Sequence, residues 1–307
     1  MLGNHINRDT RHLSITSYIK ETISDYHAHS LNMSTAAIFV SNPRGLQIIL
    51  KDEEGEELKQ FINKSKMSII AHSSYVAFLW TKEKTKEATY LKFVLKELAV
   101  CKEYNISGLV IHLPKEGILK QKYIQKIMYK LINAIVAINA STTTTLPIIY
   151  LETPAIIPMY ANYDTADKLS RLFHIIHKLG GGIGSNLFGL CIDTAHIWTS
   201  GNDISTYDGA KRWFTELMDA PYIPHDKIII HLNDSERELG HGPDKHASLT
   251  KGKIWEKYQT RGQLKTSGLF FIMEFAKKYN IPLILERRNK EMLAYDYIVV
   301  NKLQQLL

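Results

Sequence analysis

Six short aliphatic runs of this chain each end on a residue type that commonly binds metal ions, and this pattern constrains the fold strongly. Turn residues bound each run, and stretches with helical periodicity separate them, which is typical of buried parallel strands. The terminal residues are 40, 40, 41, 38 and 55 residues apart, by subtraction of their numbers. The runs are 68–72, 109–112, 148–152, 190–193, 228–231 and 283–286.

This spacing predicts a (β/α)8 TIM barrel that occupies residues 1–307 as a single domain. One strand–helix unit takes roughly 30 residues or more, and the C-terminal ends of barrel strands meet at the mouth where active sites lie. Two further runs, 2–6 and 36–40, complete the eight strands. Apolar periodicity predicts helices over the ranges 87–104, 166–179 and 268–279.

The glycine-rich segment 180–184 resembles a phosphate-binding loop, but it follows a predicted helix and precedes a predicted strand. Phosphate-binding loops need the opposite order, strand then loop then helix. We therefore expect a flexible connection here.

Six such strand ends would bring six metal-binding side chains to one place. A lone histidine there is more often a packing residue, but six at one structural position are not independent, and carboxylates buried together without a cation repel. Three further candidates lie in the segments that follow two of these strands: His196 after Asp193, and Asp244 and His246 after His231. Together the nine candidates exceed the four ligands of one tetrahedral zinc and fit about three ions that share a bridging carboxylate. Nitrogen and oxygen ligands suit Zn2+, with Mn2+ or Fe2+ as substitutes. The candidates are His72, His112, Glu152, Asp193, His196, His231, Asp244, His246 and Glu286.

The composition indicates what kind of partner the protein binds and in which compartment it lies. The net charge of +7 and pI near 9.1 favour a polyanionic partner, although a solvated lysine-rich surface explains many basic proteins. No apolar stretch reaches the roughly 18 residues of a membrane span, and residues 1–20 lack a signal-peptide core. Cys101 and Cys191 give no disulfide framework, so we expect a cytoplasmic, reducing location and no membrane partner.

At these residues the chain resembles the endonuclease IV family of zinc-dependent abasic-site (AP) endonucleases, over nearly its whole length. Residues 192–198 and 245–249 are most similar to the form found in large cytoplasmic DNA viruses, which would place the protein in viral factories or the virion. The matching segments are 42–44, His72 with Tyr75, 109–112, 151–153, 189–196, 231–235, 244–246 and 285–286.

The resemblance implies a DNA-repair enzyme that hydrolyses the phosphodiester 5′ to an abasic site in duplex DNA, leaving a 3′-hydroxyl and a 5′-deoxyribose phosphate. It implies that Glu152 is the central catalytic residue, because it would bridge a first zinc to a second. The implied ligands are His72 and His112 for the first zinc, Asp193, His231 and Glu286 for the second, and His196, Asp244 and His246 for the third.

The resemblance also implies DNA contacts. Arg44 and Tyr75 match loop residues that enter the minor groove, and Val76 takes the place of an apolar wedge. Lys245 stands where arginine is usual, so a phosphate contact would survive as a point charge and not as a bidentate pair. Without the resemblance, Arg44 is interpreted as a surface turn residue and Tyr75 as a packing residue at the rim.

The chain departs from the family pattern in two places. Residues 153–157 replace a Gly-Gln-Gly loop that often follows the bridging glutamate, which puts DNA contacts there in doubt. Residues 3–5 keep only part of the first-strand pattern, so the role of His5 stays open.

Two alternatives remain. A sugar isomerase or epimerase on the same barrel would use one or two ions; the third ligand set, the basic pI, and the Arg44 and Tyr75 loops argue against it. A non-catalytic DNA-binding relative would have lost a bridging ligand, and none is lost. We expect the protein to be a monomer.

Overall fold

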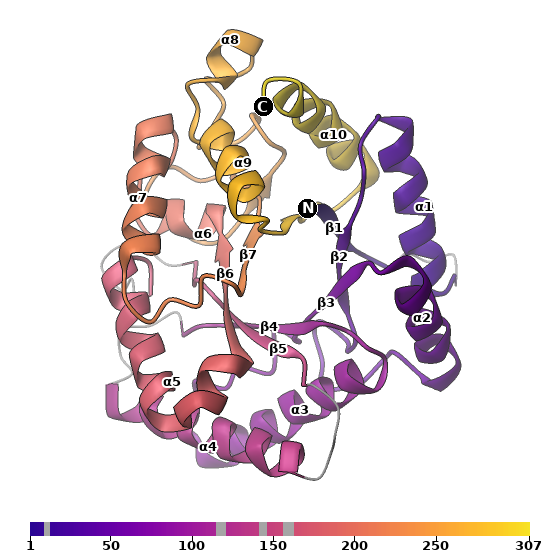
Figure 1. Ribbon diagram of the computed structural model, residues 1–307, viewed down its shortest axis with the longest axis vertical. Coiled ribbons are helices and arrows are strands. Elements are labelled where there is room, and N and C mark those ends of the chain that lie inside the picture. Colours follow the sequence, from indigo (N-terminus) through magenta and orange to yellow (C-terminus); the bar gives the residue numbers. More distant parts are fainter. Residues whose placement is uncertain (9–12, 115–120, 141–145, 156–162) are drawn as a thin grey trace.

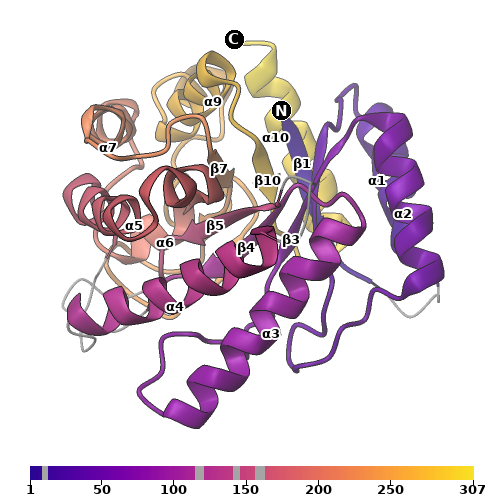
Figure 2. The same ribbon diagram turned by 60° about the horizontal axis from the view of Figure 1, so that its bottom comes forward.

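Eight parallel strands close into a barrel with helices around it, which confirms the predicted fold (Figure 1). The computed structural model describes residues 1–8, 13–114, 121–140, 146–155 and 163–307. Around the barrel the strands follow the order β1-β10-β7-β6-β5-β4-β3-β2, so β10 pairs with β1 and closes the sheet (Figure 2). The barrel strands are β1 (Leu2–Ile6), β2 (Thr35–Phe39), β3 (Ser68–His72), β4 (Gly108–His112), β5 (Ile148–Glu152), β6 (Phe188–Asp193), β7 (Ile228–His231) and β10 (Leu283–Leu285).

The helices form an outer layer around these strands. The predicted helices correspond to α3, α5 and α9, and the bounds of α9 are those expected from the sequence. None of the helices in the described part of the chain has both the length and the apolar character of a membrane span. The helices are α1 (Ile15–Ala28), α2 (Asp52–Ser65), α3 (Lys84–Glu103), α4 (Gln121–Ala140), α5 (Ala166–Leu187), α6 (Thr194–Thr199), α7 (Tyr207–Asp219), α8 (Arg261–Leu264), α9 (Gly268–Tyr279) and α10 (Lys290–Gln304).

The expected flexible connection at residues 180–184 is wrong, because this segment is helical. Helix α5 continues through the glycines to Leu187, and β6 begins at the next residue. Each glycine costs about 1 kcal/mol relative to alanine in a helix. Helix α5 packs against α4, where a Cβ on Gly180 would lie 3.5 Å from Ile132 Cγ2. Tertiary packing therefore outweighs the low helix propensity of this segment.

On six of the eight strands, the inside of the barrel changes from apolar to polar within two residues. Alternate side chains of a barrel strand point inward and build layers. One layer consists of Ala37, Ile70, Val110, Tyr150, Cys191, Ile229 and Ile284. Two positions further along the same strands stand Phe39, His72, His112, Glu152, Asp193, His231 and Glu286. The pleat of the strands therefore turns the candidate ligands toward a common axis at the mouth.

The tyrosine of the apolar layer fills the barrel below the mouth. A Cβ on Gly108 would lie 2.5 Å from the Tyr150 ring, and one on Gly189 would lie 2.8 Å from it. Glycine at these two positions leaves the room that the ring occupies. Tyr150 is 8% exposed, so the apolar layer directly below the polar layer is filled by side chains.

Candidate metal centre

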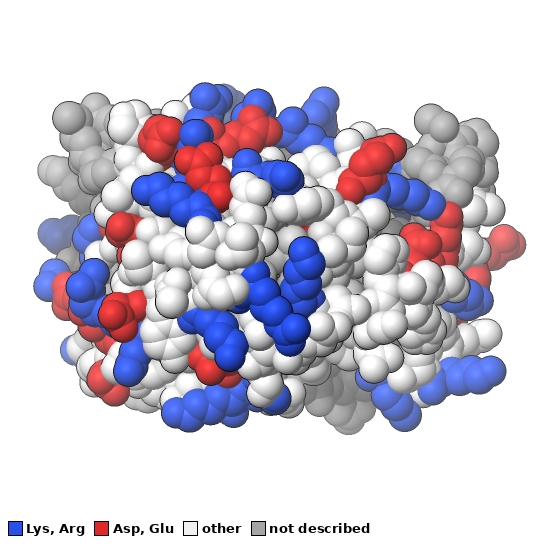
Figure 3. Space-filling model, turned by 90° about the horizontal axis from the view of Figure 1, so that it is seen from above, with Lys and Arg blue, Asp and Glu red and all other residues white. Residues whose placement is uncertain are grey.

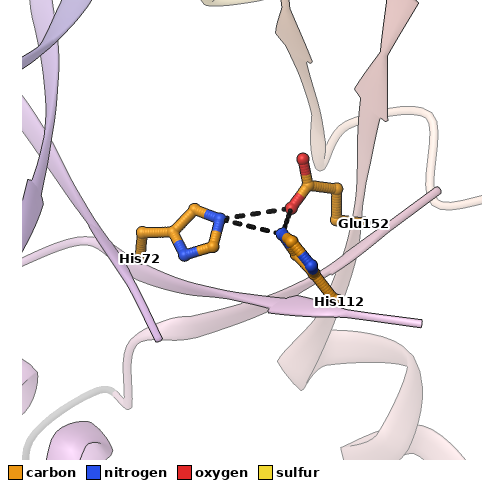
Figure 4. Close-up of side chains that lie close together, drawn as sticks. All are labelled: His72, His112 and Glu152. Carbon is orange, nitrogen blue, oxygen red and sulfur yellow. Dashed lines mark hydrogen bonds and ion pairs between the residues drawn. The ribbon is translucent and has the colours of Figure 1, made fainter. Parts of the chain in front are cut away.

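Glu152 lies between two groups of imidazole nitrogens, one group on each of its carboxylate oxygens. Oε2 is 2.8 Å from His112 Nε2 and 3.3 Å from His72 Nε2, and these two nitrogens are 3.2 Å apart (Figure 4). Oε1 is 2.9 Å from His231 Nδ1. Glu152 is 1% exposed. The first cluster is thus His72, His112 and Glu152, and the same carboxylate also belongs to the next one.

The second cluster joins three barrel strands and the residue that follows β10. His231 Nδ1 lies 3.5 Å from Glu286 Oε2 as well as close to Glu152. The candidate ligand atoms all lie within 4.8 Å of one another, which is the arrangement of several ligands around one ion. Its members are Glu152, Asp193, His231 and Glu286.

The third cluster lies further toward the rim. Asp244 Oδ2 is 3.3 Å from His196 Nε2, and Asp244 Oδ1 is 3.0 Å from His246 Nε2. Asp193 Oδ2 is 3.5 Å from the same His246 nitrogen. Asp193, His196 and His246 form a group of mutually close ligand atoms. The structure therefore brings all nine candidate residues into three adjoining clusters.

Local backbone contacts orient the ligands. Asp193 caps helix α6, because its Oδ1 accepts from Ala195 N at 2.7 Å and from His196 N at 3.1 Å. Its Oδ2 remains directed at the clusters. The Nδ1 of His196 lies 2.7 Å from Thr153 O, and a carbonyl oxygen only accepts, so Nδ1 carries the proton. This leaves the lone pair of Nε2 facing the third cluster, which is how metal-binding histidines are usually held.

A short antiparallel ribbon places Asp244 and His246. The ribbon pairs β8 (Asp234–Ser235) with β9 (His246–Ala247) directly after the end of β7. Asp234 fixes it, because its Oδ1 accepts from Ile254 N at 3.0 Å and its Oδ2 accepts from Gly252 N at 3.2 Å. The third cluster thus depends on this ribbon and not on a barrel strand alone.

The buried carboxylates of the site favour positive charge beside them. Burial opposes ionisation of Glu152, but His112 and His231 outweigh it and hold the pKa of its carboxyl well below the usual range. Burial likewise acts to lower the pKa of His196, yet Asp193 and Asp244 raise it to about 10. The carboxylates therefore hold a proton on His196, whereas burial keeps the pKa of His112 below its ordinary value. A divalent ion would replace the proton on His196.

The residues present fit such ions. Nε2 of His196 and Nε2 of His231 are buried and make no well-oriented hydrogen bond to a described residue, although Asp244 Oδ2 lies 3.3 Å from the His196 nitrogen. A buried polar atom without a partner costs free energy, and coordination of a metal would remove that cost for the His196 nitrogen. An all-nitrogen and oxygen donor set suits zinc, manganese or iron.

Several residues in contact with the clusters were not predicted. Nδ1 of His5 lies 3.2 Å from Glu286 Oε1, which gives the open position on β1 a contact with the site. Nδ2 of Asn233 donates to Asp193 Oδ2 at 2.7 Å and to Glu286 Oε2 at 3.0 Å. Cys191 is buried and also lies with Glu152 and His231 in a group of close ligand atoms. For His5 a signal existed, since it occupies the inward position of the first strand.

The predicted DNA-contacting residues lie around the mouth. Tyr75 is 53% exposed and its ring centre is 5.3 Å from that of His72, while Val76 is 38% exposed. Arg44 is exposed on the neighbouring loop, where Pro43 O accepts from Tyr75 N at 3.0 Å. Lys245 forms an ion pair with Glu236. Of the segment that replaces the family loop, residues 156 and 157 lie outside the described residues.

A cavity of about 780 Å³ opens between the Tyr75 loop and the clusters. Its wall includes the aromatic residues Tyr75, Phe78 and Trp80 together with Asp244 and His246. Trp80 is held in place because its Nε1 donates to His112 O at 2.7 Å. The cavity thus combines aromatic surface with direct access to the candidate ligands.

Comparison with known proteins supplies the family. The model of the xylose isomerase-like TIM barrel matches residues 26–292. The chain belongs to this family. A probable AP endonuclease of African swine fever virus is 34% identical over 284 residues, covering 89% of this chain and 86% of the viral protein. A putative endonuclease 4 of Acanthamoeba polyphaga mimivirus is 28% identical over 93% of this chain and 84% of its own length. These relatives confirm the resemblance to endonuclease IV and to its viral form.

Solved structures agree. The crystal structure of AsfvAP:AG superposes with a TM-score of 0.86 and 30% identity, covering 99% of both chains. Endonuclease IV from Thermus thermophilus gives 0.74 at 19% identity, covering 100% of this chain and 99% of the other, which shows a shared fold. A D-tagatose 3-epimerase-like protein gives 0.63 at 15% identity over 99% of this chain and 97% of the other. The barrel alone therefore does not separate nucleases from sugar epimerases.

Proposed function

We propose that this chain is an AP endonuclease that hydrolyses the phosphodiester 5′ to an abasic site in duplex DNA with about three zinc ions. The products are a 3′-hydroxyl and a 5′-deoxyribose phosphate. The observation that carries the proposal is the position of Glu152, whose two oxygens face separate ligand clusters at 2.8 Å and 2.9 Å. A carboxylate in this position is suited to bridge two ions.

Each cluster would hold one ion. Bound ions would neutralise the phosphate and lower the pKa of water, so that no protein nucleophile is needed. The protein would hold neighbouring ions close to one another, because Glu152 belongs to the first two clusters and Asp193 to the last two. The proposed ligands are His72, His112 and Glu152; Glu152, Asp193, His231 and Glu286; and His196, Asp244 and His246.

The rim supports selection of abasic sites. An abasic sugar has no base to unstack, so it leaves the duplex at a lower cost than an intact nucleotide, by a few kcal/mol. Tyr75 and Val76 project from one loop and Arg44 from its neighbour, beside the cavity that leads to the clusters. In this proposal they enter the duplex and stabilise the extruded sugar in the cavity.

The overall charge supports a nucleic-acid partner. The chain carries 38 Lys and Arg residues against 31 Asp and Glu residues. Figure 3 looks onto the side of the barrel near α8, α9 and α10, where several Lys and Arg side chains lie near the middle and Asp and Glu lie mainly toward the edges. Lys245 would contact a phosphate only after exchanging its partner Glu236. We further propose that the protein acts as a monomer in the cytoplasm.

The decisive experiment incubates the protein with an end-labelled duplex that contains one abasic-site analogue, with and without EDTA. We expect a single cut whose 3′ end a polymerase extends after quenching, and no cut in chelator. Unextendable ends, a borohydride-trapped adduct or full activity in EDTA would contradict hydrolysis by metal. Elemental analysis of the same sample distinguishes the endonuclease, for which we expect about three ions per chain, from a sugar epimerase, which needs only one or two.

A further inference from the structure

A buried carboxylate outside the metal clusters contacts both loops that carry the proposed DNA-binding residues. Glu97 lies on the inward face of α3 among Val94, Leu98 and Cys101, and it is 0% exposed. None of the described Lys or Arg residues forms an ion pair with it. A carboxylate buried in this way is costly unless hydrogen bonds satisfy it.

Three donors from two loops satisfy Glu97. Ser41 Oγ, on the loop after β2, donates to Oε1. Ser73 Oγ, on the loop after β3, donates to Oε2 at 2.6 Å, and Ser74 N donates to Oε1 at 3.0 Å. All three serines are almost fully buried. Burial raises the pKa of the Glu97 carboxyl, and the three donors oppose that rise, because hydrogen bonds to an ionised acceptor are about twice as strong as neutral ones.

The two loops also contact each other directly above this carboxylate. Ser74 Oγ donates to Gly45 O at 2.8 Å, and Tyr75 N donates to Pro43 O at 3.0 Å. Arg44 follows Ser41 by three residues, and Tyr75 follows Ser74 by one. The exposed residues of the rim therefore stand on buried segments that share one acceptor.

We propose that Glu97 is a positioning residue that holds the Arg44 loop and the Tyr75 loop as one recognition surface. The proposal rests on the proposed function, in which these loops select the abasic site. Glu97 does not touch substrate or metal in this scheme. It acts through Ser41, Ser73 and Ser74, by fixing the distance and angle between two exposed groups that must enter the same duplex.

The test compares Glu97→Leu with Glu97→Gln. Leucine removes the acceptor and leaves three buried donors without a partner. Glutamine restores the pattern, because its oxygen accepts from Ser41 and Ser74 while its amide nitrogen donates to Ser73 Oγ. Glu87→Leu is the matched control, since Glu87 is also buried on α3 but contacts Tyr123 and Lys130 of the neighbouring helix.

The first readout is hydrogen exchange of the backbone amides in residues 41–50 and 73–77, which needs no DNA. We expect faster exchange in both segments for Glu97→Leu, near-normal exchange for Glu97→Gln, and no change in these segments for Glu87→Leu. Unchanged exchange in folded Glu97→Leu overturns the proposal. If that variant does not fold, Ser41→Ala and Ser73→Ala take its place, and each should loosen its own loop.

The second readout is the ratio of affinities for abasic and intact duplex, measured by fluorescence anisotropy together with metal content. We expect Glu97→Leu to lower this ratio roughly tenfold, the scale of one hydrogen bond to a charged group, with metal content unchanged. Loosened loops with an unchanged ratio would overturn the positioning role. A wild-type protein that does not cut abasic DNA would instead contradict the proposed function, while the exchange result would still show whether Glu97 holds the loops.

Discussion

Glu152 has two oxygens in two different surroundings, and its importance follows from that. Oε2 faces His72 and His112, while Oε1 faces His231. His72 and His112 belong to the first cluster alone, so the loss of either would affect only one ion. Loss of Glu152 removes a ligand from both clusters and leaves three imidazoles without their shared counter-charge.

Glu152→Ala should therefore be the most damaging single substitution. We expect turnover on abasic duplex to fall roughly 10²–10³-fold or more, the scale of removing a preorganised electrostatic group, and metal content to fall by more than one ion. Asp244→Ala is the comparison, because Asp244 belongs only to the third cluster and should cost about one ion. Wild-type turnover in Glu152→Ala would refute the bridging role.

Arg44→Ala and Tyr75→Ala should weaken discrimination and leave metal content unchanged. Their side chains lie at the rim, and for Tyr75 the loss of a ring that stacks on bases costs about 1–3 kcal/mol, or roughly tenfold in affinity. Tyr129→Ala is the control, since Tyr129 has the same 53% exposure but lies on α4. Competition binding with abasic and intact duplexes measures the effect, and equal discrimination in all three variants would return both residues to structural roles.

Residues that stand at strand ends could be predicted from the sequence, whereas residues whose importance depends on contacts between distant segments could not. His72 and Glu152 each close an aliphatic run, so their position was evident. Asn233 gives no such signal, because it lies between β7 and β8 and its role depends on the hydrogen bonds that its amide donates to Asp193 and Glu286. Glu97 looks like an ordinary helix residue until the fold brings three donors to it.

At the scale of elements, the barrel strands were predictable and the ribbon was not. The barrel strands stand out as apolar runs of four or five residues, whereas β8 and β9 contain two residues each. The prediction for the glycine-rich end of α5 was wrong for the opposite reason. Local propensity favoured a loop, but packing against α4 stabilises a helix there. Asp244 and His246 were thus identified by residue type, and their geometry came only from the structure.

Gly252→Ala tests the dependence of the third cluster on this ribbon. A Cβ there would lie 2.4 Å from Ser235 O and 2.5 Å from Asp234 Oδ1, so the ribbon must shift, at a cost of about 1–3 kcal/mol. We expect a lower melting temperature and loss of about one ion, with the first two clusters still loaded. Gly262→Ala is the control, because nothing lies within 4 Å of its Cβ position. Full metal content and unchanged melting in Gly252→Ala would show that the ribbon tolerates the shift.

At the scale of the whole molecule, the excess of basic residues predicts how DNA binding responds to salt. Each neutralised phosphate contributes about −0.9 to the slope of log affinity against log salt. We expect a steep slope that is similar for abasic and intact duplexes and for unrelated sequences, because phosphate contacts carry no sequence information. Titrations between roughly 50 and 200 mM salt measure it. An affinity independent of salt would argue against a phosphate-tracking surface.

The two-residue offset between the apolar layer and the polar layer has an evolutionary consequence. Ile70 and His72, Val110 and His112, and Tyr150 and Glu152 are inward neighbours on their strands. Insertion or deletion of one residue between such a pair would turn the ligand to the helix side of the sheet. Length variation among descendants of this chain is therefore confined to loops and helices, and the strands can drift only by substitution.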